Sequence, residues 1–201
     1  MSDHLRHAGA SHAAQRQALE AIMRQNVLVM DVLRTLRQAG LPDALVGSGA
    51  IYNAVWNFLT GRPPLTGIKD VDVVYFDATD LSWEAEDAVI RRMAALFADS
   101  PVPVEVRNQA RVHLWFPEKF GTPYPRLTRS EDMLLYFASK THAVAVRLEP
   151  DDTLHIAAPF GLDDMFSFRI TPNHALDNAA THARKAERAQ AIWPELTVVP
   201  W

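Results

Sequence analysis

VGSG at residues 46–49 and IKDVDVVYF at residues 68–76 are the stretches around which the rest of this sequence is arranged. The first predicts a short strand that turns at a Gly-Ser pair into a helix. The second predicts a strand, in which Asp70 and Asp72 share one face and the intervening valine points to the other. Paired carboxylates suit a hard cation, and the N–H groups at a helix start suit a phosphate. Together they indicate metal-assisted phosphoryl chemistry.

The composition is that of an ordinary globular protein, with 201 residues of which 48% are hydrophobic and 22% charged. A formal net charge of −4 excludes a global basic field that would hold nucleic acid non-specifically. The absence of cysteine excludes disulfides and thiolate metal sites. No signal peptide or membrane span is recognisable, so we expect a cytoplasmic protein without a membrane partner.

The periodicity of apolar residues predicts helices and strands in alternation. We expect an α/β (α+β) fold, a small mixed sheet flanked by helices, in one domain over residues 1–201. Its core would span about residues 12–125 and a small C-terminal lobe about residues 126–201. Residues 1–11 are expected to be a frayed terminus. Helices are expected at 11–39 (one, or two in tandem), 50–60, 82–98, 130–139 and 175–192, and strands at 44–46, 102–107, 111–116, 143–148 and 153–157.

A third carboxylate, Glu105, lies on the polar face of the expected strand 102–107. If this strand lies beside the one that carries Asp70 and Asp72, the three carboxylates can share one or two magnesium ions. The alternative is that all three belong to the solvated polar face of a half-exposed sheet.

The order of these features resembles the nucleotidyltransferase superfamily of the DNA polymerase beta type. GRPP at residues 61–64 is similar to the tRNA CCA-adding branch, from which the chain departs at Asn53 and by the extra residues 65–68. The closer resemblance is to a small bacterial nucleotidyltransferase-like family that was formerly a domain of unknown function. The motifs that carry it are GSGAI at 47–51, DVDVVYFD at 70–77, NQARVHLW at 108–115 and APFGLDD at 158–164.

This resemblance implies a substrate, a cofactor and a set of site residues. A nucleoside triphosphate would donate a nucleoside monophosphate, with AMP the expected choice, to an unknown hydroxyl acceptor on a small molecule, RNA or protein. Asp70, Asp72 and Glu105 would be the catalytic residues and would hold two Mg²⁺ ions, with Mn²⁺ as a substitute. Gly47, Ser48 and Gly49 would bind the departing phosphates. Lys69, Arg107 and Arg111 are further candidates for nucleotide binding, because a guanidinium or ammonium group can bind phosphate oxygens.

Several alternatives stay open at this point. Arg111 can bind phosphate or pair with a nearby carboxylate in a structural role. His113 and Trp115 are more typical of structural residues, and one of Asp163 and Asp164 is expected to cap a helix. At the level of function, the rivals are an inactive nucleotide- or protein-binding module of the same fold and a metal-dependent phosphohydrolase.

Overall fold

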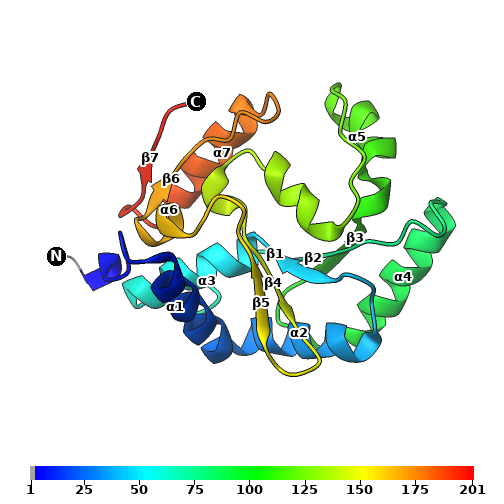
Figure 1. Cartoon of the computed structure of the whole chain (residues 1–201), viewed down its shortest axis with the longest axis horizontal. Helices are drawn as coiled ribbons and strands as arrows, with labels where there is room; N and C mark the ends of the chain where they lie inside the picture. The colour runs from blue at the N-terminus through cyan, green and yellow to red at the C-terminus, as the bar shows by residue number, and fades with distance from the viewer. Residues whose placement is uncertain (1–2) are drawn as a thin grey trace.

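A five-stranded mixed sheet lies at the centre of the structure, a computed structural model that describes residues 3–201 (Figure 1). Its strand order is β3-β2-β1-β4-β5. β2 and β3 run parallel, whereas β1 is antiparallel to both β2 and β4, and β4 to β5. The expected mixed sheet is therefore confirmed. The strands are β1 (Leu45–Gly47), β2 (Val71–Tyr75), β3 (Val104–Asn108), β4 (Ala145–Leu148) and β5 (Leu154–Ala157).

The helices expected from three- and four-residue spacing are confirmed. The first expected helix is a tandem pair that meets at Asn26. Ser11, Asn26 and Ser82 cap α1, α2 and α4, and each side chain accepts a hydrogen bond from the N–H three residues ahead. None of the helices within residues 3–201 is long and apolar enough to cross a bilayer. The helices that match the expected ranges are α1 (His12–Gln25), α2 (Val27–Ala39), α3 (Gly49–Thr60), α4 (Trp83–Leu96) and α7 (Ala179–Gln190).

The two faces of the sheet are covered unequally. One face carries the main core, in which residues of α1, α2 and α3 pack against buried strand residues such as Val71 and Val73. The other face carries a smaller cluster in which Leu45 and Val74 lie under Met133 and Leu134. The latter two belong to η3 (Ser130–Tyr136), a 3-10 helix where an α-helix was expected. This second cover leaves part of the sheet open.

The C-terminal part of the chain does not fold apart from the sheet. β4 and β5, which match the strands expected at 143–148 and 153–157 within the lobe, pair as a hairpin and complete the main sheet beside β1. The remaining elements form a small annex around a two-stranded parallel sheet. They are η4 (Lys140–His142), α6 (Asp163–Phe166), β6 (Arg169–Ile170), α7 and β7 (Thr197–Val198).

Residues 3–11 pack against the rest of the chain, so the expectation of a frayed terminus over 1–11 is wrong for residues 3–11. Residues 1 and 2 lie outside the described residues. The His4 ring packs edge-on against Phe168 with ring centroids 4.8 Å apart. The Gly9 N–H donates to the Asp163 carboxylate at 2.7 Å. The segment, which includes η1 (Asp3–Leu5), therefore adds aromatic and polar contacts to the annex.

The expected strand 111–116 is wrong, because residues 109–120 are helical. The Asn108 side chain accepts the Ala110 N–H at 3.0 Å and begins η2 (Gln109–Arg111), which runs into α5 (Val112–Phe120). Apolar residues at every second position suggested a strand, but the positions four apart also match a helix. Tertiary contacts decide in favour of the helix.

Those contacts centre on a buried ion pair between Glu86 of α4 and Arg111 of η2. The Glu86 carboxylate also accepts the Asn108 N–H at 2.8 Å, and the Arg111 Nε–H donates to the Leu81 carbonyl at 2.9 Å. Glu86 is 2% exposed. The pair thus joins α4, the end of β3 and the start of α5.

Arg111→Met is expected to lower the free energy of unfolding by about 3 kcal/mol or more, because it leaves the Glu86 carboxylate buried without its partner. Urea denaturation measures this. Arg91→Met is the matched control, since Arg91 pairs with Asp87 at 2.7 Å while 74% exposed, and it should cost about 1 kcal/mol or less. Equal losses in the two variants would contradict the structural role of Arg111.

Candidate functional site

Asp72 lies at the centre of the open part of the sheet. In the register of the sheet it is opposite Glu105 of β3 on one side and Gly47 of β1 on the other. Asp70 lies two residues before it and therefore on the same face. The valines on either side of Asp72 are buried in the main core, which fixes the carboxylate on the opposite, solvent-facing side.

The carboxylates influence one another electrostatically. Burial raises the pKa of Asp72, and the negative charge of Asp70 adds to this increase. Glu105 acts in the same direction, whereas Lys185 and Arg107 partly offset it. Although the Asp72 side chain is exposed to solvent, enough protein surrounds it to desolvate it. This combination is typical of the floor of a concave surface.

Glu105 is not gathered into a ligand cluster with the two aspartates. Its carboxylate lies 3.6 Å from the Arg107 guanidinium on the same strand. Within residues 3–201, no three His, Asp or Glu side chains converge closely enough to hold a metal ion together. The register therefore brings Glu105 beside Asp72 on one face, while its side chain is directed to Arg107.

The turn at Ser48 joins β1 to α3 in a strained conformation. Ser48 has φ 46°, in the left-handed region that non-glycine residues rarely adopt. Its hydroxyl donates to the His142 carbonyl at 2.9 Å and its N–H donates to the Val144 carbonyl at 2.8 Å. Both donors of Ser48 are therefore already used within the protein. The donors left at this helix start are the N–H groups of Gly49 and Ala50, which have no acceptor inside the helix.

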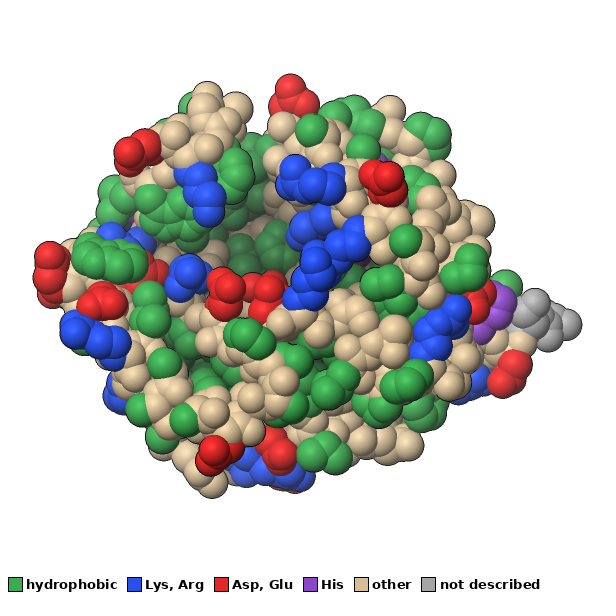
Figure 2. Space-filling model, turned by 180° about the vertical axis from the view of Figure 1, so that it is seen from behind, with side chains coloured by type: hydrophobic (Ala, Val, Ile, Leu, Met, Phe, Trp, Pro, Cys, Tyr) green, Lys and Arg blue, Asp and Glu red, His purple; other side chains and the backbone are tan. Residues whose placement is uncertain are grey.

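Helix α7 supplies basic side chains that the sequence motifs do not place in the site. The charge of Lys185 acts on Asp72, and the charge of Arg188 acts on Tyr52. Desolvation lowers the pKa of Lys185, and the nearby Asp72 opposes that effect. Figure 2 shows a hollow with Lys and Arg side chains along one side and acidic side chains at its edge. The only signal for them in the sequence is that Arg184, Lys185 and Arg188 make one side of this helix basic.

Tyr52 and His142 form a buried stack beneath this region. Their rings lie 4.4 Å apart at an interplanar angle of 27°. Burial lowers the pKa of His142 to about 3, and neither of its ring nitrogens has a hydrogen-bond partner within the described chain. Burial raises the pKa of Tyr52 to about 12, so its hydroxyl remains a proton donor at neutral pH. Neither residue was predicted from the sequence to belong to the site, because the pairing of their rings depends on tertiary structure.

The other residues considered from the sequence lie on different elements: Lys69 before β2, Arg107 on β3, Arg111 in η2, and His113 and Trp115 on α5. Lys69 is exposed beside Asp70, and Arg107 is exposed on β3. Arg111 is in the buried pair with Glu86, which favours its structural alternative over phosphate binding. His113 and Trp115 lie on α5, where the Trp115 ring packs near Phe116 and under Lys119.

A nucleotidyltransferase family matches this chain over residues 34–198. The chain belongs to that nucleotidyltransferase family. The matched range includes the Ser48 turn, both aspartates, Glu105 and α7. No curated protein sequence matches the chain significantly.

Solved structures show the same fold. A protein whose NMR structure "reveals a CCA-adding enzyme head domain" superposes with a TM-score of 0.72 at 23% identity, over 92% of this chain and 96% of that one. The Thermotoga maritima CCA-adding enzyme complexed with tRNA superposes with a TM-score of 0.55 at 14% identity. That match covers 90% of this chain but 42% of the Thermotoga enzyme. The expected nucleotidyltransferase-like fold, a small mixed sheet flanked by helices, is therefore confirmed, and it matches the fold of a CCA-adding enzyme head domain.

His142 is expected to make the protein less stable in mild acid. The unfolded chain binds a proton at this histidine near its ordinary pKa of 6.5, whereas the folded ring stays neutral down to about pH 3. The free energy of unfolding therefore falls as pH drops below 6.5, approaching about 1.4 kcal/mol per pH unit. Urea titrations between pH 7 and 5 give the free energy of unfolding at each pH, and for His142→Leu this free energy should fall less steeply with decreasing pH than for wild type. A slope as steep as that of wild type would contradict the assignment, and His12→Leu, at an exposed position, is the control.

Proposed function

We propose that this protein transfers a nucleoside monophosphate, AMP by preference, from a nucleoside triphosphate to a hydroxyl acceptor in a magnesium-dependent reaction. The observation that carries the proposal is the open sheet face with Asp70 and Asp72, next to the start of α3 and within the field of Lys185. Membership of a nucleotidyltransferase family supports the reaction class.

The donor set fits magnesium in its chemistry. Asp70, Asp72 and Glu105 offer only carboxylate oxygens, the ligands that magnesium prefers. Burial and, after it, repulsion from Asp70 and Glu105 raise the pKa of Asp72, and a divalent cation would relieve that repulsion. Asp70 and Asp72 would hold the metal, and Glu105 would join them by turning away from Arg107. When bound, magnesium ions would neutralise phosphate charge and lower the pKa of the acceptor hydroxyl.

Basic groups on two sides of the carboxylates suit a triphosphate. Lys185 and Arg188 of α7 and Arg107 of β3 can offset its negative charge. The N–H groups of Gly49 and Ala50, at the positive end of the α3 dipole, can donate to phosphate oxygens. In this proposal Ser48 holds the turn in place through its two internal hydrogen bonds and does not donate to phosphate.

For the acceptor, we propose an RNA hydroxyl as the first candidate to test. The Thermotoga enzyme of similar fold was solved with tRNA, and this supports RNA over a small molecule or a protein. With a net charge of −4, the chain would have to hold RNA through a local basic surface such as that of α7. An assay with labelled nucleoside triphosphates distinguishes this transferase from an inactive binding module and from a phosphohydrolase.

With α-³²P-labelled nucleoside triphosphates and magnesium, wild type is expected to release pyrophosphate and to leave label on the RNA fraction. Asp70→Asn and Asp72→Asn should each lower the rate by about 100-fold or more, because each removes a ligand charge needed in the transition state. Labelled free monophosphate would instead indicate hydrolysis. Equal pyrophosphate release by wild type and both variants would contradict the catalytic proposal.

Lys185→Ala is expected to weaken nucleotide binding by about 5- to 50-fold, because it removes a charge that faces the carboxylates and the proposed phosphates. Isothermal titration calorimetry with a non-hydrolysable ATP analogue and magnesium measures this. Arg184→Ala makes the same charge change on the same helix, but no effect of Arg184 on Asp72 is found. If both variants bind as tightly as wild type, α7 is not part of the nucleotide site.

A further inference from the structure

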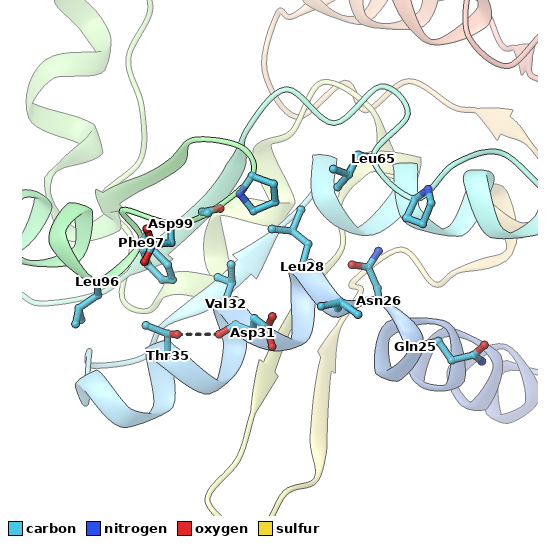
Figure 3. Close-up of a pocket in the computed structure, with 14 residues that line it drawn as sticks. Gln25, Asn26, Leu28, Asp31, Val32, Thr35, Leu65, Leu96, Phe97 and Asp99 are labelled. Atoms are coloured by element: carbon cyan, nitrogen blue, oxygen red, sulfur yellow. Dashed lines mark hydrogen bonds between the residues drawn. The ribbon is translucent and has the colours of Figure 1, made fainter.

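A cavity lies on the helix-covered side of the sheet, away from Asp70 and Asp72. Its volume is about 410 Å³, and its walls come from the start of α2, residues 64 and 65, and the end of α4 with residues 97–101 (Figure 3). Pockets of this size accommodate drug-sized ligands. None of the residues proposed for nucleotide transfer lines it.

The cavity has an apolar body. Leu28 and Val32 of α2 are buried at its base, whereas Val27, Leu65 and Leu96 are 73%, 40% and 52% exposed around it. The free energy of the system falls when a ligand removes exposed apolar side chains of this size from water. The ligand should therefore present an apolar surface.

The charges that line the cavity are all negative. Asp31 and Asp99 contribute carboxylates, and no Lys, Arg or His from the described chain lines it. Asp31 is paired with Arg34 at 3.2 Å in an ion pair whose two side chains are more than half exposed, and such a pair is weak. For Asp99 no ion pair is found within residues 3–201. In Figure 3, Asp99 lies near Phe97 on the side away from Gln25, and Asp31 lies on α2 between Thr35 and Asn26.

The other polar side chains in the wall already have partners in the protein. The Asn26 carbonyl oxygen accepts the Val29 N–H, the Thr35 hydroxyl donates to the Asp31 carbonyl, and the Ser100 hydroxyl donates to the Val102 carbonyl. The Gln25 amide and the Asn26 NH2 group add neutral polar atoms to the wall, and the two carboxylates are the charged groups that determine which ligand binds.

We propose that this cavity binds a small organic cation, an ammonium group carried on an apolar body. The apolar part lies against Leu28, Val32 and Leu65, and the ammonium group faces Asp31 and Asp99. Residues 64 and 65 lead into β2, and the segment ending at Pro101 leads into β3. The ligand would thus contact the chain in the segments that precede β2 and β3, the strands that carry Asp72 and Glu105. Binding at this cavity does not depend on nucleotide transfer.

The test uses the full ¹⁵N-labelled protein and three naphthalene probes of similar size. They are 1-naphthylmethylamine, which is cationic at pH 7, the neutral 1-naphthalenemethanol and the anionic 1-naphthaleneacetate. The amine is expected to bind with a Kd of about 10⁻⁴ to 10⁻³ M and to shift amide signals of residues around the cavity. It should bind about 3- to 10-fold more tightly than the alcohol, with the acid weakest.

Two variants link the binding to the cavity. Asp31→Asn/Asp99→Asn should remove the preference for the amine while keeping the binding of the alcohol. Leu65→Trp should block all three probes by filling the opening, and Leu114→Ala, which changes an exposed leucine on α5, should leave all three unchanged. Equal affinity for the three probes in wild type, or shifts outside the cavity that persist in Leu65→Trp, would overturn the proposal.

Discussion

The attachment of the Ser48 turn to residues 142–144 is the constraint on which the rest of the structure depends. Two hydrogen bonds from Ser48 hold the end of β1 against the C-terminal half of the chain, and a positive φ is maintained there despite its cost. The same turn begins α3 and places its first N–H groups beside the sheet face. The attachment also sets Gly47 opposite Ala145 of β4, and on the other side of β1 Gly47 pairs with Asp72 of β2.

The candidate site follows from how the two faces of the sheet are covered. The main core takes one face entirely, whereas η3 covers the other only in part and leaves the carboxylates open to solvent. Protein around Asp72 still desolvates it, and like charges raise its pKa, which makes the face a region of unfavourable negative potential. A bound cation would relieve that potential. Lys185 of α7 provides part of the compensation within the protein.

Much of the fold could be predicted because its signals are local. Helical spacing identified α3, α4 and the region of α1 and α2, although not the break at Asn26, and alternation along β2 separated the carboxylates from the valines. The prediction failed where long-range contacts decide. Residues 111–116 satisfy both strand and helix patterns, and the Glu86–Arg111 pair selects the helix. Lys185 and His142 come to the site only through the packing of α7 and η4, which brings the His142 ring onto Tyr52 of α3, and the sequence contains no short-range signal for that packing. The order of strands in the sheet was likewise not predictable from local periodicity.

The central claim is that the Asp70–Asp72 face binds a divalent metal together with a nucleotide. Electron paramagnetic resonance of Mn²⁺, titrated with protein and a non-hydrolysable ATP analogue, tests it without requiring the acceptor. The account predicts that wild type removes the signal of free Mn²⁺ and broadens the bound spectrum only when the analogue is present, and that Asp72→Asn abolishes the effect beyond that of the analogue alone. Equal Mn²⁺ binding by wild type and Asp72→Asn would contradict the account.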